Sequence, residues 1–442
     1  MPLTIVMLGA TGDLFQKKLA GALFELFRGG FLEKSFRVVG ISRKEMSDVE
    51  FREFVHAAVL QNNHKRRGQI SEFVSHFFYH RGDIGEQATY QSLADFLEAS
   101  DMKAGMCSNK LFYLAVRPAL YETVFKNLAK SGLTVPCAPR VRTGGANWCR
   151  VLVEKPFGNN LKEAERLDRV LGRLFDEKQI FRIDHYLAKE ALQNILSFRF
   201  SNSTTEPLWN STHIEQVEIK FFERGVVGAR GAFYDGVGAL RDVGQNHMLE
   251  MLALVAMERP TCISAECIRK ERARVLRAVR IPRAPLADFA ARAQYDGYRA
   301  EKGVSPNSET ETYFKIKLGI ENDRWRGVPF ILESGKGLPE SKVEIRVHFK
   351  GKIKKAGFSP RTDGQGSVVV FAISGDKKKP APKNIPDAYE RVFCEALRGD
   401  QTIFTSTEEV TAAWKIITPI VERWGEVPLV KYKIGTTPKT TM

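Results

Sequence analysis

The chain reads Leu8-Gly9-Ala10-Thr11-Gly12-Asp13-Leu14 between an apolar run, Thr4–Leu8, and an amphipathic stretch, Leu14–Phe27. Glycines at a strand-to-helix turn let the backbone approach a pyrophosphate, and the helix N-terminus favours an anion. The spacing is G-x-x-G, so the three-glycine fingerprint is incomplete, and a tight turn without a ligand explains the segment equally well in isolation. Its place at the first strand-helix turn favours dinucleotide binding.

Outward from this turn, the first 185 residues alternate short apolar runs with amphipathic stretches. The predicted strands are Thr4–Leu8, Phe36–Ile41, Phe77–Tyr79, Leu111–Ala115, Val151–Val153 and Ile180–Ile183. The predicted helices are Leu14–Phe27, Asp48–Leu60, Gln87–Ala99, Ala119–Lys130 and Leu161–Phe175. This alternation predicts a parallel, doubly wound sheet.

After about residue 200 the pattern changes to longer β-type runs with helices set apart. The predicted strands are Ile214–Phe222, Tyr313–Ile320, Val343–Phe349 and Ser367–Ile373, and the predicted helices are Asp242–Met257, Asp387–Leu397 and Glu408–Trp424. Strands next to strands predict a large, mainly antiparallel sheet. We therefore expect a Rossmann-like α/β dinucleotide-binding domain over residues 1–185 and an α+β domain over residues 186–442.

Composition excludes several classes of protein. The chain has 442 residues, of which 43% are hydrophobic, and no apolar run reaches the roughly 18 residues of a membrane helix. The first residues enter a strand pattern without a signal segment. Six scattered cysteines without a C-x-x-C pair indicate neither a disulfide framework nor a zinc site. We expect a reduced, cytoplasmic protein without a metal or a membrane.

The net charge of +15 raises the question of nucleic-acid binding. The basic residues are spread along the chain, and the densest clusters, at 64–67, 350–355 and 377–379, lie in contexts typical of exposed loops. A basic surface that attracts anionic substrates is the simpler interpretation, so we expect no nucleic-acid partner.

The end of the second predicted strand bears on the choice of dinucleotide. An acid there would accept hydrogen bonds from the ribose of NAD, but the chain has Ser42-Arg43-Lys44. An arginine can pair with a 2′-phosphate, which favours NADP. A solvated turn with two cations is the alternative, and Glu45 could serve NAD.

Two further segments follow predicted strands and carry chemical groups. Glu154-Lys155-Pro156 ends a strand at the edge where ligands of open α/β sheets bind, and Pro156 favours a cis peptide or a tight turn that aims Lys155 into the cleft. The alternative is an exposed lysine at a turn. The run 182–190, Arg-Ile-Asp-His-Tyr-Leu-Ala-Lys-Glu, places His185, Tyr186 and Lys189 at a helix start, which predicts a phosphate site.

An acid beside a phosphate needs its own partner, and Asp184 is that acid. His247 lies in a predicted helix with polar neighbours at Asp242 and Asn246. A lone histidine on an apolar helix is more often structural. An Asp–His pair, however, is the usual way to orient an imidazole as a general base, so Asp184 and His247 are candidates for such a pair.

Five motifs occur in order along the chain: G-A-T-G-D-L at 9–14, E-K-P-F-G at 154–158, R-I-D-H-Y-L-A-K-E at 182–190, R-D-V-G-Q-N-H at 241–247 and S-G-K at 334–336. Together they closely resemble the glucose-6-phosphate dehydrogenase family. The resemblance runs from about residue 3 to at least residue 350. It implies oxidation of glucose 6-phosphate with reduction of NADP or NAD, in a homodimer or homotetramer that assembles through the large sheet of the substrate-binding second domain.

The resemblance also implies roles for residues. His247 is the implied base for the C1 hydroxyl of the sugar, and Asp184 is the implied partner that orients it. The implied substrate ligands are His185, Tyr186 and Lys189 for the phosphate, Glu223 and Asp242 for hydroxyls, and Lys155 and Lys336 over the sugar. The implied cofactor-binding residues are Gly9, Thr11, Gly12, Asp13, Leu14, Lys18, Ser42, Arg43 and Lys155.

Two other interpretations remain. Another sugar oxidoreductase with a dinucleotide domain and its own E-K-P motif would not need the cluster of His185, Tyr186 and Lys189. A non-catalytic relative that acts as a binding or regulatory subunit would be expected to have a broken site, whereas Asp184, His247 and both lysines are present.

Overall fold

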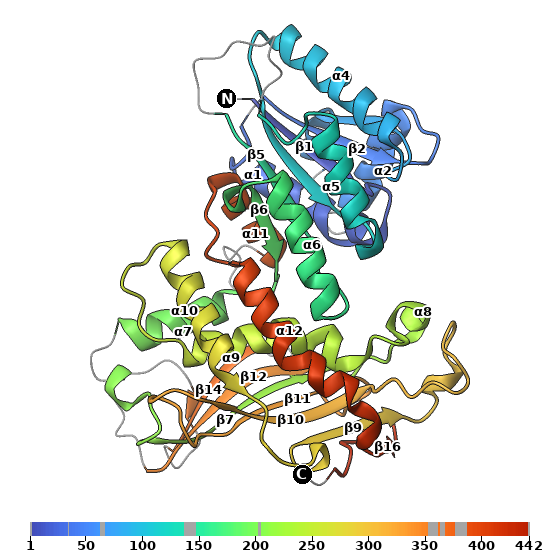
Figure 1. The fold of residues 1–442 in the computed structure, drawn as a ribbon. Coiled ribbons are helices and arrows are strands. Elements are labelled where there is room, and N and C mark those ends of the chain that lie inside the picture. Colours follow the sequence, from blue (N-terminus) through green and yellow to red (C-terminus); the bar gives the residue numbers. More distant parts are fainter. Residues whose placement is uncertain are drawn as a thin grey trace. The chain divides into compact units, whose positions relative to one another are not determined.

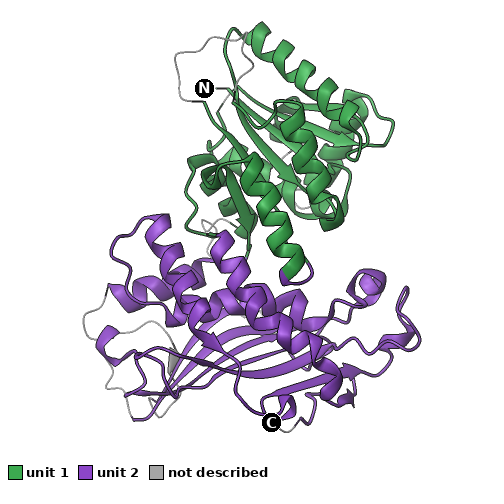
Figure 2. Ribbon diagram, in the orientation of Figure 1, with its two compact units in different colours: residues 1–158, 162–185, 384–405 green, residues 159–161, 186–383, 406–442 purple. Residues whose placement is uncertain are grey.

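The structure is a computed structural model that describes residues 2–33, 35–61, 67–136, 147–201, 205–351, 361–362, 367–375 and 387–440. It forms two compact units (Figure 2): unit 1 is residues 1–158, 162–185 and 384–405, and unit 2 is residues 159–161, 186–383 and 406–442. The chain passes between the units at the predicted boundary of 185 and 186. Unit 1 also contains 384–405, which the sequence prediction left in the second domain. The basic clusters at 64–67, 350–355 and 377–379 lie wholly or mostly outside the described residues.

Unit 1 is built on a seven-stranded sheet with the order β15-β6-β5-β4-β1-β2-β3. Its strands are β1 (Leu3–Leu8), β2 (Phe36–Ser42), β3 (Phe77–Arg81), β4 (Asn109–Leu114), β5 (Cys149–Val153), β6 (Ile180–Ile183) and β15 (Phe404–Thr405). Strands β1 to β6 pair in parallel, and only β15 is antiparallel to its neighbour. The predicted doubly wound sheet is thus confirmed.

Helices flank this sheet (Figure 1). They are the π-helix η1 (Phe15–Leu19), α1 (Ala20–Arg28), α2 (Asp48–Leu60), α3 (Arg67–Val74), α4 (Gln87–Ala104), η2 (Pro118–Leu120), α5 (Tyr121–Lys130), α6 (Leu161–Leu174), η3 (Glu177–Gln179) and α11 (Ala388–Arg398). Helix α2 begins at a capping box, in which Ser47 and Glu50 exchange hydrogen bonds. This local signal explains why α2 starts where the sequence predicted.

Residues 387–405 complete unit 1 although they come late in the chain. Strand β15 pairs with β6, and Phe404 packs against Phe181 with ring centroids 4.9 Å apart. The guanidinium of Arg150 donates to the carbonyl oxygens of Ala396 and Leu397, both at 2.7 Å, at the end of α11. The segment therefore covers the edge of the sheet that β6 would otherwise expose.

Unit 2 contains a nine-stranded sheet with the path β13-β14-β12-β7-β11-β10-β9-β16, and β8 pairs with β10. The strands are β7 (Ile214–Phe222), β8 (Val279–Arg280), β9 (Ala290–Tyr295), β10 (Tyr313–Ile320), β11 (Phe330–Gly335), β12 (Lys342–Phe349), β13 (Arg361–Thr362), β14 (Val368–Gly375) and β16 (Leu429–Tyr432). Most pairs are antiparallel, which confirms the α+β prediction; β7 with β11 and β9 with β16 are parallel.

Figure 1 shows the longer helices of unit 2 on one face of this sheet. They are α7 (Glu190–Phe200), α9 (Leu249–Ala256), α10 (Ala265–Ala278) and α12 (Thr407–Glu422); shorter elements are η4 (Glu206–Leu208), η5 (Gly228–Arg230), α8 (Gly231–Tyr234), the π-helix η6 (Leu240–Met248), η7 (Leu286–Asp288), η8 (Tyr298–Ala300) and η9 (Trp424–Glu426). The prediction of one helix over Asp242–Met257 misses the change from η6 to α9 at residue 249, and α10 was not predicted.

A buried ion pair joins three of these helices. Arg272 of α10 lies 2.5 Å from Glu409 of α12 and 3.9 Å from Glu250 of α9, and both Arg272 and Glu409 are fully buried. Removal of one partner from such a pair leaves a buried charge, which costs about 3–5 kcal/mol. The pair therefore fixes how the helical layer packs.

Two findings bear on cysteines and membranes. Cys262 and Cys267 are joined by a disulfide just before and within the first turn of α10, with their Cα atoms 5.8 Å apart. The expectation of cysteines without disulfides is wrong here, because a separation of five residues across a helix start brings two side chains within bonding reach. Among the described residues, no helix is long and apolar enough to cross a membrane.

Candidate functional site

The glycine turn lies where the strand order of unit 1 reverses, between β1 and β4. Gly9 adopts φ +88°, and a Cβ on it would overlap the carbonyl oxygen of Ala115 after β4. The backbone N–H of Gly9 donates to the carbonyl of Ile41 at 3.0 Å. A crevice at this switch point is the usual ligand site of open α/β sheets. The turn is thus a backbone cradle in which a side chain at Gly9 would clash with the backbone after β4.

The predicted cofactor residues beside the turn come from two strand ends. Thr11 and Ser42 share a hydrogen bond of 2.9 Å between their hydroxyls. Gly12 and Asp13 are exposed, Leu14 is half-buried, and Asp13 pairs with Lys17 at 2.7 Å. Lys18 lies on η1 and is exposed, without a described contact to the other predicted residues.

Two arginines lie at neighbouring strand ends, Arg43 after β2 and Arg81 at the end of β3. The side chain of Arg43 is 80% exposed and lies 3.8 Å from Asp83, too far for a hydrogen bond. The Glu45 carboxylate, which could have served a ribose, pairs with Arg81 at 3.0 Å. Arg43 is therefore an exposed cation that could turn towards a ligand at the end of β2.

Lys155 follows β5, and its bond to Pro156 is cis, one of the two geometries that the sequence favours. The preceding residue, Glu154, is buried and accepts a hydrogen bond of 2.5 Å from the Tyr113 hydroxyl. Burial raises the pKa of the Glu154 carboxyl, while Tyr113 and then Lys155 act in the opposite direction. A buried, hydrogen-bonded carboxyl therefore directly precedes the turn at Lys155.

Asp184 and His185 end unit 1. Asp184 is buried, with 3% of its surface exposed. The ring of His185 stacks on Tyr389 of α11, with centroids 5.7 Å apart and planes at 9°. Tyr389 also shares a hydrogen bond with Glu154. A partly buried network thus connects the turn at Lys155 to the predicted phosphate ligand His185.

Within unit 2, two aromatic rings lie beside His247, and a lysine lies over one of them. The Tyr186 ring lies 4.5 Å from that of His247, centroid to centroid, and the ammonium of Lys189 lies 3.7 Å from the centre of the same tyrosine ring. Phe221 also stacks on the imidazole, with centroids 6.1 Å apart and planes at 12°, and its ring lies 4.9 Å from that of Tyr186. His247 is 1% exposed, so these rings restrict its orientation. Tyr186, Lys189 and His247 therefore belong to one cluster of unit 2.

A second cluster of unit 2 centres on Lys336. Its ammonium contacts the carboxylate of Glu223 and lies 3.6 Å from that of Asp242. Asp242 also lies 4.0 Å from the guanidinium of Arg230. The structure thus brings three predicted substrate ligands together as one cation between two carboxylates, an arrangement that can hold several sugar hydroxyls.

The π-helix η6 carries Asp242 and His247 and connects the two clusters. The side-chain carbonyl of Asn246 accepts a hydrogen bond of 2.8 Å from the His247 backbone, and its amide donates to the carbonyl of Asp242 at 3.1 Å. π-Helices are rare and often mark functional sites. Lys18 lies on the other π-helix, η1.

Sequence reasoning missed several residues of the site. Phe221 was placed in a predicted strand only for its apolar character, and Tyr389 was placed only in a predicted helix 200 residues away. Alternation along β7 could have placed Phe221 on the same face as Ile219, but no local signal identifies Tyr389 as a neighbour of His185.

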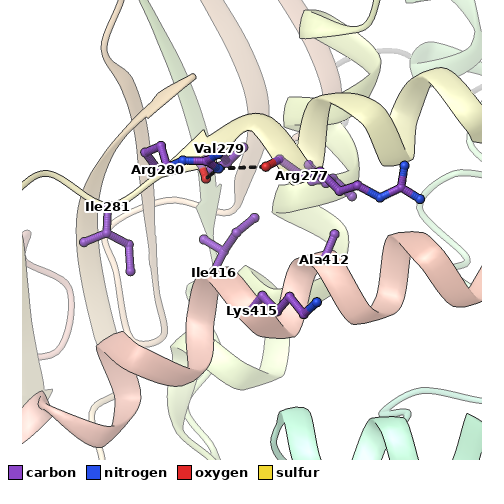
Figure 3. Close-up of a pocket in the computed structure, with 8 residues that line it drawn as sticks. Arg277, Val279, Arg280, Ile281, Ala412, Lys415 and Ile416 are labelled. Atoms are coloured by element: carbon purple, nitrogen blue, oxygen red, sulfur yellow. Dashed lines mark hydrogen bonds between the residues drawn. The ribbon is translucent and has the colours of Figure 1, made fainter. Parts of the chain in front are cut away.

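The structure also describes a cavity of about 390 Å³ between α10, β8 and α12 (Figure 3). Arg277, Arg280 and Lys415 line it with apolar residues, and none of the predicted site residues does. Arg277 pairs with Glu408, and Arg280 lies 3.3 Å from Glu321, so both arginines already have carboxylate partners. Among the described residues, no group of three or more His, Cys, Asp or Glu side chains could hold a metal ion.

The chain is similar to known proteins along nearly its whole length. The family description "Glucose-6-phosphate dehydrogenase, NAD binding domain" matches residues 6–194, and the C-terminal domain description of the same family matches residues 196–378 and 353–441. A glucose-6-phosphate 1-dehydrogenase from Chlamydia muridarum (strain MoPn / Nigg) is 35% identical, over 96% of this chain and 91% of that protein.

Two further similarities extend this result. A protein of Arabidopsis thaliana named glucose-6-phosphate 1-dehydrogenase 6, cytoplasmic, is 37% identical over 98% of this chain and 88% of its own length. A solved structure described as glucose-6-phosphate dehydrogenase in complex with its substrate glucose-6-phosphate superposes with a TM-score of 0.86 at 32% identity, covering 99% of this chain and 95% of that one.

Proposed function

The chain belongs to the glucose-6-phosphate dehydrogenase family, and we propose that His247 is its general base. The protein is an NAD(P)-dependent oxidoreductase that oxidises glucose 6-phosphate to 6-phosphoglucono-1,5-lactone, the first step of the oxidative pentose phosphate pathway. This oxidation removes a hydride from C1 of the sugar and a proton from the C1 hydroxyl. The bound nicotinamide supplies the hydride acceptor.

The role of His247 as base is supported by its surroundings. The imidazole is buried and packs against the rings of Tyr186 and Phe221, which restrict its orientation. A general base must lie within hydrogen-bond reach of the proton it takes, and fixed placement is what makes it effective. Asp184 is proposed as the residue that orients His247. The two residues belong to different units, so their pairing stays a prediction from the sequence.

The substrate phosphate is proposed to bind at Tyr186 and Lys189, together with His185, which directly precedes Tyr186. The Lys189 ammonium lies over the tyrosine ring, and it carries a positive charge and N–H donors that suit an anion. Phosphate oxygens accept strong hydrogen bonds from a lysine. The cluster therefore separates glucose 6-phosphate from an unphosphorylated sugar.

The sugar hydroxyls are proposed to bind at Glu223, Asp242 and Lys336. Each carboxylate accepts hydrogen bonds from hydroxyls, and the lysine between them donates. Lys336 also neutralises part of the negative charge beside a phosphorylated substrate. Lys155 is proposed to contact substrate and cofactor from the turn after β5.

NADP is the proposed cofactor. The cradle at Gly9 fits a pyrophosphate, because the backbone there carries no side chain that would keep a ligand away from the turn. Arg43 is mostly exposed, and Glu45 is paired with Arg81, so the end of β2 offers a cation rather than an acid. A cation there favours the 2′-phosphate of NADP over the free ribose hydroxyl of NAD.

Assembly and location are proposed on family grounds. A homodimer or homotetramer in the cytoplasm is expected, and the Arabidopsis relative carries the word cytoplasmic in its name. Light scattering at working concentrations would measure the number of subunits, and a monomer would contradict the assembly.

The test of the mechanism is His247→Asn, with His213→Asn as the matched control on an exposed histidine of the same unit. Loss of the base is expected to lower kcat by about 10²–10⁴-fold, with little change in the KM for glucose 6-phosphate. The control should keep wild-type kinetics. Near-normal kcat in His247→Asn would eliminate this residue as the base.

The test of the substrate is turnover of glucose beside glucose 6-phosphate. Because Lys189 and its neighbours have no partner on an unphosphorylated sugar, kcat/KM should be far higher for the phosphorylated one. Equal values for the two sugars would favour another sugar oxidoreductase, and no turnover of either would favour a non-catalytic relative.

A further inference from the structure

The loop that leads into η6 is held by a segment far from it in sequence, residues 308–312. The carboxylate of Asp235 accepts hydrogen bonds from the Ser308 hydroxyl and, at 2.9 Å, from the Thr310 hydroxyl. The backbone of Gly236 donates to the same threonine oxygen at 2.8 Å. The loop is therefore tied down before η6 begins.

Glu311 makes the contacts closest to the start of η6. The Leu240 N–H donates to Glu311 Oε1 at 3.0 Å, and the Ala239 N–H donates to the Glu311 carbonyl at 3.1 Å. The first N–H groups of a helix have no partner within it, so a buried acceptor there satisfies one of them. Glu311 is 3% exposed, so water cannot replace it in that position.

The space around the Glu311 carboxylate is filled by backbone. Gly238 has φ +76°, and a Cβ on it would overlap the carboxylate oxygens of Glu311. The side chain thus lies directly against the turn before η6. Burial raises the pKa of this carboxyl, while the Leu240 N–H and more weakly Arg241 lower it. Oε1 can accept the hydrogen bond in either protonation state.

Thr312, the residue after Glu311, holds Lys336 of the cluster formed by Glu223, Asp242 and Lys336. The Lys336 N–H donates to the carbonyl of Thr312 at 2.9 Å. Lys336 in turn lies 3.6 Å from Asp242 on η6. Both sides of the Lys336–Asp242 contact are therefore attached to adjacent residues, Glu311 and Thr312.

We infer that Glu311 is a positioning residue for the reaction. Its carboxylate fixes the start of η6 and thereby places Asp242 and His247 relative to Lys336. The inference rests on the proposed roles of those three residues. Glu311 contacts neither substrate nor cofactor in this scheme, and it acts only through the helix that it holds.

The experiment compares three variants of Glu311 with Glu309→Ala, a control on the same segment whose side chain is 69% exposed. Glu311→Ala removes the acceptor, Glu311→Asp withdraws it by one methylene, and Glu311→Gln keeps an acceptor oxygen at the same reach. Each is assayed for kcat and for the KM of glucose 6-phosphate and of NAD(P), and its thermal midpoint is recorded.

Misplacement of a base by about 1 Å can cost about 100-fold in rate, so Glu311→Ala is expected to lower kcat at least about tenfold. The KM for NAD(P) should stay within about twofold, since unit 1 is unchanged. Glu311→Gln should recover most of the lost kcat. Glu309→Ala should match the wild type.

Wild-type kcat in Glu311→Ala would overturn the inference, and so would a Gln variant as slow as the Ala variant. If Glu311→Ala does not fold, the Asp and Gln variants decide: a lower kcat for Asp supports positioning, and equal values refute it. A wild-type enzyme that does not oxidise glucose 6-phosphate would refute the proposed function instead.

Discussion

At the scale of single residues, the site depends on charges whose partners are few. In unit 2 one lysine, Lys336, lies between Glu223 and Asp242, and another, Lys189, lies over the Tyr186 ring. In unit 1 the corresponding exposed charge is Arg43.

Arg43 leads to a prediction about cofactor choice. Arg43→Ala should lower kcat/KM for NADP by about 10–100-fold, because a charged hydrogen bond contributes roughly 1.5–3 kcal/mol, and should leave NAD nearly unchanged. The measurement is the ratio of kcat/KM with the two cofactors at fixed glucose 6-phosphate. Arg326→Ala removes an arginine of unit 2 whose side chain is 73% exposed, and this variant should leave the ratio unchanged. An unchanged ratio in Arg43→Ala would move the discrimination to another residue.

Some residues of the candidate site could be proposed because they follow strand ends, whereas Glu223, Asp242 and Lys336 were proposed from the family resemblance. Lys155, Asp184 and His185 each follow a strand of unit 1, and parallel strands end at the same edge. Glu311 and Tyr389 could not be predicted in this way. Each is distant in sequence from the residue that it holds, and only the tertiary fold brings them together.

At the scale of elements, two π-helices carry residues of the predicted site. The sequence predicted ordinary helices at both places, because hydrophobic periodicity does not distinguish one residue of extra winding. In η6 the packing explains the difference in part: a Cβ on Gly244 would lie 2.8 Å from Leu240 Cδ1 and 2.9 Å from Phe314 Cζ. Such contacts arise only after the sheet has formed.

The turn between β1 and η1 leads to a prediction about glycine. Gly9→Ala should destabilise unit 1 and raise the KM for NAD(P) at least about tenfold, because a side chain at positive φ is strained and this one would also overlap Ala115. Gly21→Ala, in α1, has open space around it and should be neutral or slightly stabilising. Thermal midpoints and cofactor kinetics of both variants test this. A Gly9→Ala variant with wild-type cofactor KM would contradict the cradle.

At the scale of the whole molecule, unit 1 is not continuous in sequence, because it includes a segment that follows most of unit 2. The amphipathic pattern of Asp387–Leu397 predicted α11 correctly, but such a pattern does not say which sheet a helix covers. Helix α11 and strand β15 belong to unit 1, although they follow residues 186–383 of unit 2 in the sequence. The sequence alone therefore could not show that residues 384–405 leave the predicted second domain and belong to unit 1.

The late segment is expected to stabilise unit 1, and Phe404→Ala tests this. Phe404 is fully buried against Phe181, so its truncation should cost about 3–5 kcal/mol, with the loss centred on β15 and β6. Hydrogen exchange measured by mass spectrometry should show faster exchange in peptides that cover Ile180–Ile183. Ile434→Ala, at an exposed position of unit 2, should leave exchange unchanged. If Phe404→Ala accelerates exchange only in peptides of unit 2, residues 387–405 do not stabilise the nucleotide-binding unit.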